Sequence, residues 1–324
     1  MSNNKLAATY KVVGDCRIET LIYVPKESSP QSKHPVIIDI HGGGFMLGHS
    51  GMVNQDQIQD CLDRGWIVVV PDHRLCPQVD ISALIDDIRD LLRWIQTGKL
   101  DEFLAKESKS NVQCDLDRII AFGTSAGGHL SLCLGYGVEK PVAAILDFYG
   151  PCNFTNPFWT SKIPSLYSKI PKFPEEFIGK VYSETPIPTK GGVSLEGQAD
   201  TGPNFKDPRV AFAMTHIANG TLMSVCAPSK DYDKIDPICN IAKGYPPTCI
   251  VHGQSDTMVP ITLSRDLYAV LKKEGVECGM IEVPGEEHTF AGKMAKGGQT
   301  WELQRKGFDW VEDVLARVQP LGGQ

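Results

Sequence analysis

The sequence predicts an α/β protein in which helices flank a mostly parallel sheet. Short apolar runs alternate with longer amphipathic ones, which is the pattern of strands joined by crossover helices. Most of the short runs are continuously apolar, as strands covered on both faces should be. The expected strands are Ile18–Val24, Pro35–Ile40, Trp66–Pro71, Arg118–Gly123, Val142–Tyr149, Pro247–His252 and Gly279–Val283.

The longer runs carry apolar residues at helical spacing. In Val79–Gln96 this spacing places one apolar stripe along the helix, which would pack on the sheet. The run at the end of the chain is expected to close the sheet. The expected helices are Asn54–Arg64, Val79–Gln96, Ser125–Tyr136, Ile261–Glu274 and Gln299–Val318.

Residues 151–245 interrupt the alternation. They hold 11 of the 22 prolines and 11 of the 26 aromatic residues, without a clear order of strands and helices. A structureless loop of that length is improbable inside a compact domain. We therefore expect 151–245 to be an inserted cap or lid with a small core of its own, and 1–150 together with 246–324 to form the catalytic core.

Composition excludes several classes of function. Charged residues make up 22% of the chain and the net charge is −7, from 32 basic and 39 acidic side chains, so no basic face for nucleic acid is expected. No run of about 20 apolar residues and no signal peptide is present, which predicts a cytoplasmic protein. The ten cysteines are scattered and form no CxxC pair, so we expect free thiols and no metal site.

One short motif suggests a nucleophile. Gly123-Thr124-Ser125-Ala126-Gly127 follows an expected strand and leads into an expected helix. This strand, sharp turn and helix is the context of a nucleophile elbow, which would hold up Ser125. The same small residues would also suit a packing turn, so the motif needs partners elsewhere in the chain.

A second motif suggests an oxyanion site. His41-Gly42-Gly43-Gly44-Phe45 directly follows the expected strand Pro35–Ile40. Three successive glycines free the backbone to turn its N–H groups toward a developing negative charge. We expect the N–H groups of Gly43, Gly44 and Ala126 to form an oxyanion hole; the alternative is a flexible surface turn.

A nucleophilic serine needs a general base and an acid that orients it. In a sheet with the elbow in its middle, the base is expected on the loop after the last strand and the acid on the loop after the strand before it. His288 meets this condition for the base, and Asp256 for the acid, which gives the chain order Ser125, Asp256, His288. His252 and His129 are expected to be packing residues. The rivals to Asp256 are three aspartates at the end of the insertion: Asp231, Asp233 and Asp236.

Together these segments resemble a known family. HGGGF, GTSAGG, GQSD and EEHTF are similar to motifs of the hormone-sensitive-lipase-like branch of the α/β-hydrolases, and PDHRLCPQ resembles that branch's DYRLAPE stretch. The resemblance covers nearly the full length and implies an α/β-hydrolase fold with a large cap inserted after the sixth strand. The cap's start, FYGPCNFTNPFW, is similar to fungal members found beside polyketide pathways.

Three positions depart from that branch. Thr124 stands where an acid is usual, and His73 and Gln78 replace the tyrosine and glutamate of DYRLAPE. None of the three is an expected triad member. They bear on substrate preference, because these positions support the elbow and the pocket floor.

The combined expectation is a serine carboxylesterase that forms an acyl-enzyme on Ser125, without metal or organic cofactor. Its partner would be a small to medium apolar or aromatic acyl substrate, contacted by Phe45, Tyr149 and Trp159. The chain carries no signal for an oligomeric state. The alternatives are a thioesterase, lactonase or cyclising enzyme that releases a polyketide, an arylformamidase or peptidase, and a binding protein on a hydrolase scaffold, against which the retained His288 argues.

Overall fold

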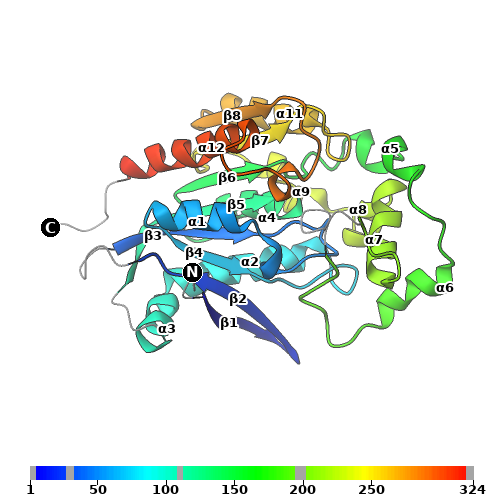
Figure 1. Cartoon of the computed structure of the whole chain (residues 1–324), viewed down its shortest axis with the longest axis horizontal. Helices are drawn as coiled ribbons and strands as arrows, with labels where there is room; N and C mark the ends of the chain where they lie inside the picture. Colours follow the sequence, from blue (N-terminus) through cyan, green and yellow to red (C-terminus); the bar gives the residue numbers. More distant parts are fainter. Residues whose placement is uncertain (1–4, 27–32, 108–111, 194–201, 319–324) are drawn as a thin grey trace.

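An eight-stranded sheet lies between helices in the computed structural model, which describes residues 5–26, 33–107, 112–193 and 202–318 (Figure 1). The strand order is β1-β2-β4-β3-β5-β6-β7-β8. The β1/β2 and β2/β4 pairs are antiparallel and all the others are parallel. The predicted mostly parallel α/β architecture is confirmed. The remaining residues of the expected core and cap, 1–4, 27–32, 108–111, 194–201 and 319–324, lie outside the described residues.

All seven expected strands occur, with ends shifted by a few residues, and the structure adds an eighth. The added strand, β1, escaped prediction because it is an edge strand whose buried side chains are only Ala8 and Tyr10. The strands are β1 Lys5–Val13, β2 Cys16–Tyr23, β3 Lys33–Ile40, β4 Ile67–Pro71, β5 Gln113–Thr124, β6 Ala144–Phe148, β7 Thr248–Gly253 and β8 Cys278–Val283.

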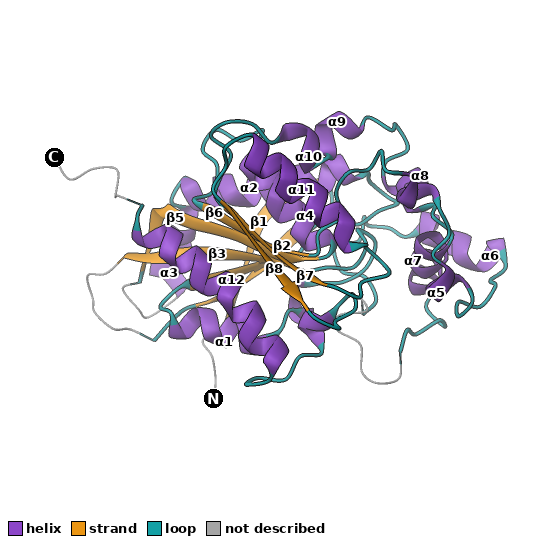
Figure 2. Cartoon of the chain, turned by 90° about the horizontal axis from the view of Figure 1, so that it is seen from above, coloured by secondary structure: helices purple, strands orange, loops and turns teal. Residues whose placement is uncertain are grey.

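Helices cover both faces of the sheet (Figure 2). On one face, α12 packs on β6, β7 and β8, and α1 packs on β4. Most buried apolar residues of α2, α4 and α11 belong to the cluster on the opposite face. The helices of the core are α1 Gln55–Asp63, α2 Ile81–Gln96, α3 Lys99–Glu107, α4 Ala126–Leu132, α11 Ile261–Lys273 and α12 Gln299–Ala316. Each expected helix is present, and α3 is an addition.

The chain between β6 and β7 contains only helices and irregular segments among its described residues. Both views place α5 to α8 beyond one end of the sheet (Figures 1 and 2). Several of its buried residues, including Trp159, Val181 and Phe212, belong to the same apolar cluster as the core. The helices are α5 Pro164–Tyr167, α6 Glu175–Ile178, α7 Pro208–Ala218, α8 Leu222–Cys226, α9 Tyr232–Ile235 and α10 Pro237–Asn240.

Within the described ranges, no helix is both long and apolar enough to cross a bilayer.

Helix α4 approaches the sheet so closely that one of its residues has no space for a side chain. A Cβ atom on Gly127 would lie 1.9 Å from the carbonyl oxygen of Ile40, the last residue of β3. That distance is far below any van der Waals contact, and the obstacle is backbone. The glycine is therefore what lets α4 begin directly beneath the carboxyl ends of β3 and β5.

We expect Gly127→Ala to destabilise the protein by about 1–3 kcal/mol or more, because the helix must move away from the strand. Urea unfolding measures the change. The matched control is Gly179→Ala: Gly179 has helical φ and ψ of −66° and −14°, and its Cβ would meet nothing within 4 Å. The control should stay within about 0.5 kcal/mol of the wild type. Equal stabilities for the two variants would contradict the close-packing account.

Candidate active site

Ser125 sits at a sharp turn between the end of β5 and the start of α4. Its φ of 53° and ψ of −122° lie in a region that non-glycine residues rarely adopt. Its N–H donates to the carbonyl of Phe148 on the neighbouring strand, at 2.9 Å. The expected elbow geometry is therefore present, and Ser125 projects from the carboxyl end of the sheet.

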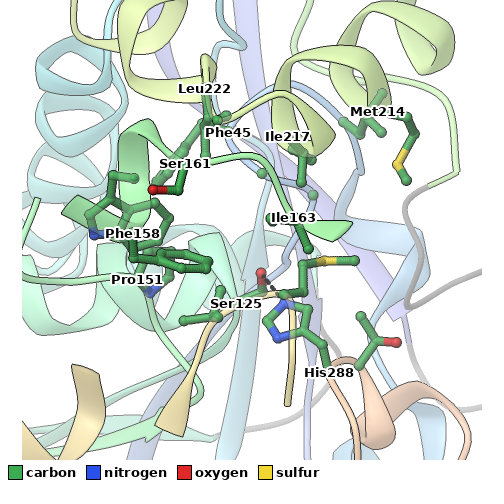
Figure 3. A pocket seen from close by; sticks show the side chains of 18 residues that line it. Phe45, Ser125, Pro151, Phe158, Ser161, Ile163, Met214, Ile217, Leu222 and His288 are labelled. Carbon is green, nitrogen blue, oxygen red and sulfur yellow. Dashed lines mark hydrogen bonds between the residues drawn. The ribbon is translucent and has the colours of Figure 1, made fainter. Parts of the chain in front are cut away.

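Ser125, His288 and Asp256 form one hydrogen-bonded line. The Oγ of Ser125 lies 2.9 Å from Nε2 of His288 (Figure 3). The Nδ1 of His288 lies 2.6 Å from Oδ2 of Asp256. Because a carboxylate only accepts, Nδ1 carries the proton and Nε2 of the neutral ring accepts from the serine. The structure thus brings together the three side chains expected from the motifs, from the loops after β5, β7 and β8.

The Asp256 carboxylate is held as an anion. Burial raises its pKa, but the nearby His288 and the hydrogen bonds from His252 and His288 outweigh burial and hold the pKa well below its usual range. Its Oδ1 accepts from the backbone N–H groups of Met258 and Val259, at 2.9 and 2.8 Å. Asp236, one of the three alternative candidates for the acid, instead accepts hydrogen bonds from the backbone N–H groups of Asn153 and Phe154, in the segment after β6.

The glycine loop after β3 adopts the conformation that only glycines allow. Gly43 has a φ of 133°, and a Cβ on it would lie 2.1 Å from the carbonyl oxygen of Leu47. Gly43 and Gly44 line the same pocket as Ser125 and His288, and Ala126 begins the helix after the serine. All three expected oxyanion residues therefore lie around the nucleophile.

Two stacked histidines, His41 and His73, pack beside the glycine loop. The rings of His41 and His73 lie 4.5 Å apart with 13° between their planes. Their Nδ1 atoms donate to the carbonyls of Gly42 and Arg74, both at 2.8 Å. Burial lowers both pKa values, that of His41 to about 3, so the rings stack as neutral groups at neutral pH. His73, at the position of the family's tyrosine, is thus part of the base of the loop.

An apolar pocket opens above Ser125. It encloses about 720 Å³ including its mouth, and none of the described residues that line it is an aspartate, glutamate, lysine or arginine. Side chains from the insertion form its roof and sides (Figure 3). They include Phe158, Trp159, Ile163, Met214, Ile217 and Leu222. The pocket suits an uncharged acyl or alcohol group.

The three expected substrate contacts differ in their positions. Phe45 and Trp159 line the pocket, and the indole N–H of Trp159 donates to the carbonyl of Cys152 at 3.0 Å. Tyr149 is absent from the described lining: its ring is fully buried and packs edge-on against His288, with 4.8 Å between ring centroids. Its place favours support of the histidine rather than contact with substrate.

Arg209 on α7 ties the insertion to the core. Its guanidinium is buried and donates to the carbonyls of Met46 and Cys76, at 2.9 and 2.7 Å, and to the side chain of Gln78, at 2.6 Å. It also pairs with Glu184 at 2.7 Å. Gln78, the replacement for the family's glutamate, therefore accepts from an arginine of the insertion. This tie holds Met214 and Ile217, further along α7, above the glycine loop.

Sequence reasoning missed two parts of the site. His252, expected to be a packing residue, lies 3.1 Å from the Asp256 carboxylate through its Nε2. The pocket side chains of α7, Met214 and Ile217, were not singled out, because nothing local in the insertion shows which face of a helix meets the pocket. The contact between His252 and Asp256 did have a signal in the sequence: His252 lies at the end of a strand, four residues before Asp256.

In the part of the chain that the structure describes, no three histidine, cysteine, aspartate or glutamate side chains gather in a way that could hold a metal ion.

Comparison with known proteins gives two family matches. Residues 21–186 match the BD-FAE family, and residues 190–317 match the prolyl oligopeptidase family. Two fungal relatives are non-reducing polyketide synthases. The chain is 30% identical to Preu6 of Preussia isomera and 28% identical to atr1 of Stereocaulon alpinum, over 93% and 95% of its own length. It spans only 14% and 13% of the length of those relatives.

Solved structures agree on the fold. Esterase 2 of Thermogutta terrifontis superposes with a TM-score of 0.62 at 18% identity, over 99% of this chain and 97% of that one. A Staphylococcus aureus protein of unknown function gives a TM-score of 0.68 at 19% identity, over 96% of this chain and 99% of its own. The predicted α/β-hydrolase fold is confirmed, and so is the likeness to fungal biosynthetic proteins. The hormone-sensitive-lipase-like branch and the boundaries of the cap stay predictions.

Proposed function

Because the chain belongs to the BD-FAE family of α/β-hydrolases, and because Ser125 stands in line with His288 and Asp256, we propose that it hydrolyses carboxylic esters. The observation that carries the proposal is this hydrogen-bonded line at the floor of an apolar pocket. A packing turn needs no base within 2.9 Å of its serine. A binding protein on this scaffold would have no reason to retain it.

The first half-reaction forms an acyl-enzyme. Ser125 Oγ attacks the acyl carbon while His288 Nε2 takes its proton, and Asp256 stabilises the resulting imidazolium. The tetrahedral intermediate collapses, its bond to the leaving oxygen breaks, and His288 returns the proton to that oxygen. Water then repeats the sequence in the same site, releases the acid and restores Ser125.

The negative charge of each tetrahedral intermediate would be held by backbone N–H groups of Gly43, Gly44 and Ala126. Donors fixed in the backbone around the nucleophile would need no reorganisation when the charge forms. Loss of one such donor typically costs about 2.7–4 kcal/mol of transition-state stabilisation. Every step uses a side chain, a backbone N–H group or water.

The pocket favours an uncharged substrate of small to medium size, with an apolar or aromatic acyl or alcohol group. Its polar lining side chains are Ser125, Ser161, His288 and Thr289. A charged acyl group would be desolvated there without an ion-pair partner, at a cost of several kcal/mol.

We expect Ser125→Ala to lower kcat for a short-chain p-nitrophenyl ester by at least about 1,000-fold, because the attacking oxygen is removed. The matched control is Ser161→Ala, a second serine that lines the same pocket. The control should keep kcat within a few-fold of the wild type. Steady-state rates of the three proteins test this, and full turnover by the Ser125 variant would exclude it as the nucleophile.

A second candidate is the release of an acyl group from a thioester or its transfer to another acceptor. It is favoured by the match to polyketide synthases along more than nine-tenths of the chain. The same Ser125, His288 and Asp256 would serve, because the acyl-enzyme is common to both reactions. The two candidates differ only in the leaving group and the final acceptor.

A pair of substrates with the same aromatic acyl group separates the candidates. For an esterase, we expect kcat/KM for the phenyl ester of benzoic acid to equal or exceed that for the matching N-acetylcysteamine thioester. A thioester preference of tenfold or more, about 1.4 kcal/mol, would support the second candidate. Ester formation when an alcohol is added, measured by mass spectrometry of the products, would point to acyl transfer.

A further inference from the structure

Asp256 is shared by two histidines. Its Oδ2 lies 2.6 Å from Nδ1 of His288 and 3.1 Å from Nε2 of His252. The Nδ1 of His252 lies 2.7 Å from Oγ of Ser264 on α11. Building on the esterase function proposed above, we propose that His252 and Ser264 extend the triad by two members, with His252 as a positioning residue for the Asp256 carboxylate.

The protonation of His252 follows from its partners. Its Nε2 also lies 2.8 Å from the carbonyl oxygen of Val259, which can only accept. Nε2 therefore carries a proton, shared between this carbonyl and Asp256. In the neutral ring Nδ1 then accepts the hydroxyl proton of Ser264. Because His252 and Ser264 are both fully buried, water cannot compete for these bonds.

The second histidine completes the set of donors around the carboxylate. Oδ1 is taken by the N–H groups of Met258 and Val259, and Oδ2 by the two histidines. Four donors match the approximately four lone-pair positions of a carboxylate. Without His252 one position on Oδ2 would be empty, and the carboxylate could rotate away from His288.

The extension links the site to the scaffold of the sheet. His252 belongs to β7 and Ser264 to α11. The Asp256 carboxylate is therefore held by a strand and a helix as well as by its own loop. The ring of Tyr149 packs edge-on against both His288 and His252, with centroid distances of 4.8 and 6.1 Å. A ring held by packing and by two hydrogen bonds is a suitable support for a catalytic carboxylate.

Of the described residues, two carboxylates face His252, each from a different element. One is Asp256, on the loop after β7. The other is Glu282, paired with His252 in the register of β8 and ion-paired with Arg265 of α11. Both remain in the variants described below, so a change in the pH profile reports on the lost imidazole.

The test compares His252→Leu with His252→Gln, which keeps an N–H donor at this position. We expect the Leu variant to lose about 10- to 100-fold in kcat for the p-nitrophenyl ester, the factor expected for one hydrogen bond to a charged group, with KM nearly unchanged. The acidic limb of its kcat/KM profile should move to higher pH, because a carboxylate with fewer donors attracts the His288 proton more strongly. The Gln variant should regain most of the kcat and the original limb.

Ser264→Ala provides the second variant should His252→Leu fail to fold. It removes only the hydroxyl that fixes the tautomer of His252, and a loss of several-fold in kcat without a change in KM is expected. The proposal is overturned if the Leu variant retains wild-type kcat and pH limb. It is also overturned if Leu and Gln lose activity equally with an unmoved limb, because His252 then acts through packing alone.

A readout without turnover separates this inference from the esterase proposal. The N–H proton of His288 that bonds to Asp256 should give a low-field proton NMR signal, and His252→Leu should shift that signal while His252→Gln should restore it. A wild type that hydrolyses no ester but shows this pattern would overturn the esterase function and leave the positioning role supported. An unshifted signal in the Leu variant would overturn the positioning role.

Discussion

The strained backbone of Ser125 is the constraint on which the site depends. A residue with φ of 53° and ψ of −122° can persist only where its surroundings hold it, and here they are the end of β5 and the start of α4. Helix α4 can begin there because Gly127 lies against the carbonyl of Ile40. The same contact brings the glycine loop after β3 beside the serine. The nucleophile and the expected oxyanion donors are therefore placed by one piece of close packing.

The insertion supplies much of the pocket lining, whereas Ser125, Asp256 and His288 come from the core. Arg209 donates to the carbonyl of Met46, just after the glycines of the loop, and to that of Cys76, after β4. Its side-chain partners Gln78 and Glu184 come from the core and the insertion. A backbone bridge adds to this tie, because Gly48 and the segment at Gly191 exchange hydrogen bonds of 2.9 and 3.0 Å. Met214 and Ile217 are thereby held in the pocket above Ser125, so the pocket shape and the position of the glycine loop are mechanically connected.

The core and the grouping of Ser125, Asp256 and His288 could be predicted from the sequence because their signals are local. Buried parallel strands give continuous apolar runs, and Ser125 and Asp256 each follow such a run, whereas His288 follows the half-buried edge strand β8. What escaped prediction depends on contacts between distant segments: the edge strand β1, the tie through Arg209, and the second bond from His252 to Asp256. The three departures from the hormone-sensitive-lipase-like pattern also needed the structure. His73 stacks under the loop, Gln78 accepts from Arg209, and Thr124 shares a recess with Asp39 of β3, so an acid does lie beside the elbow.

The central claim is that Ser125 is an activated nucleophile. The most direct measurement is the site of covalent labelling by a fluorophosphonate probe, mapped by mass spectrometry of peptides from the intact chain. The account predicts one adduct, on the peptide that contains Ser125, and its loss when the protein is unfolded before labelling. An unlabelled native protein, or a stable adduct on another serine while Ser125 stays free, would contradict it.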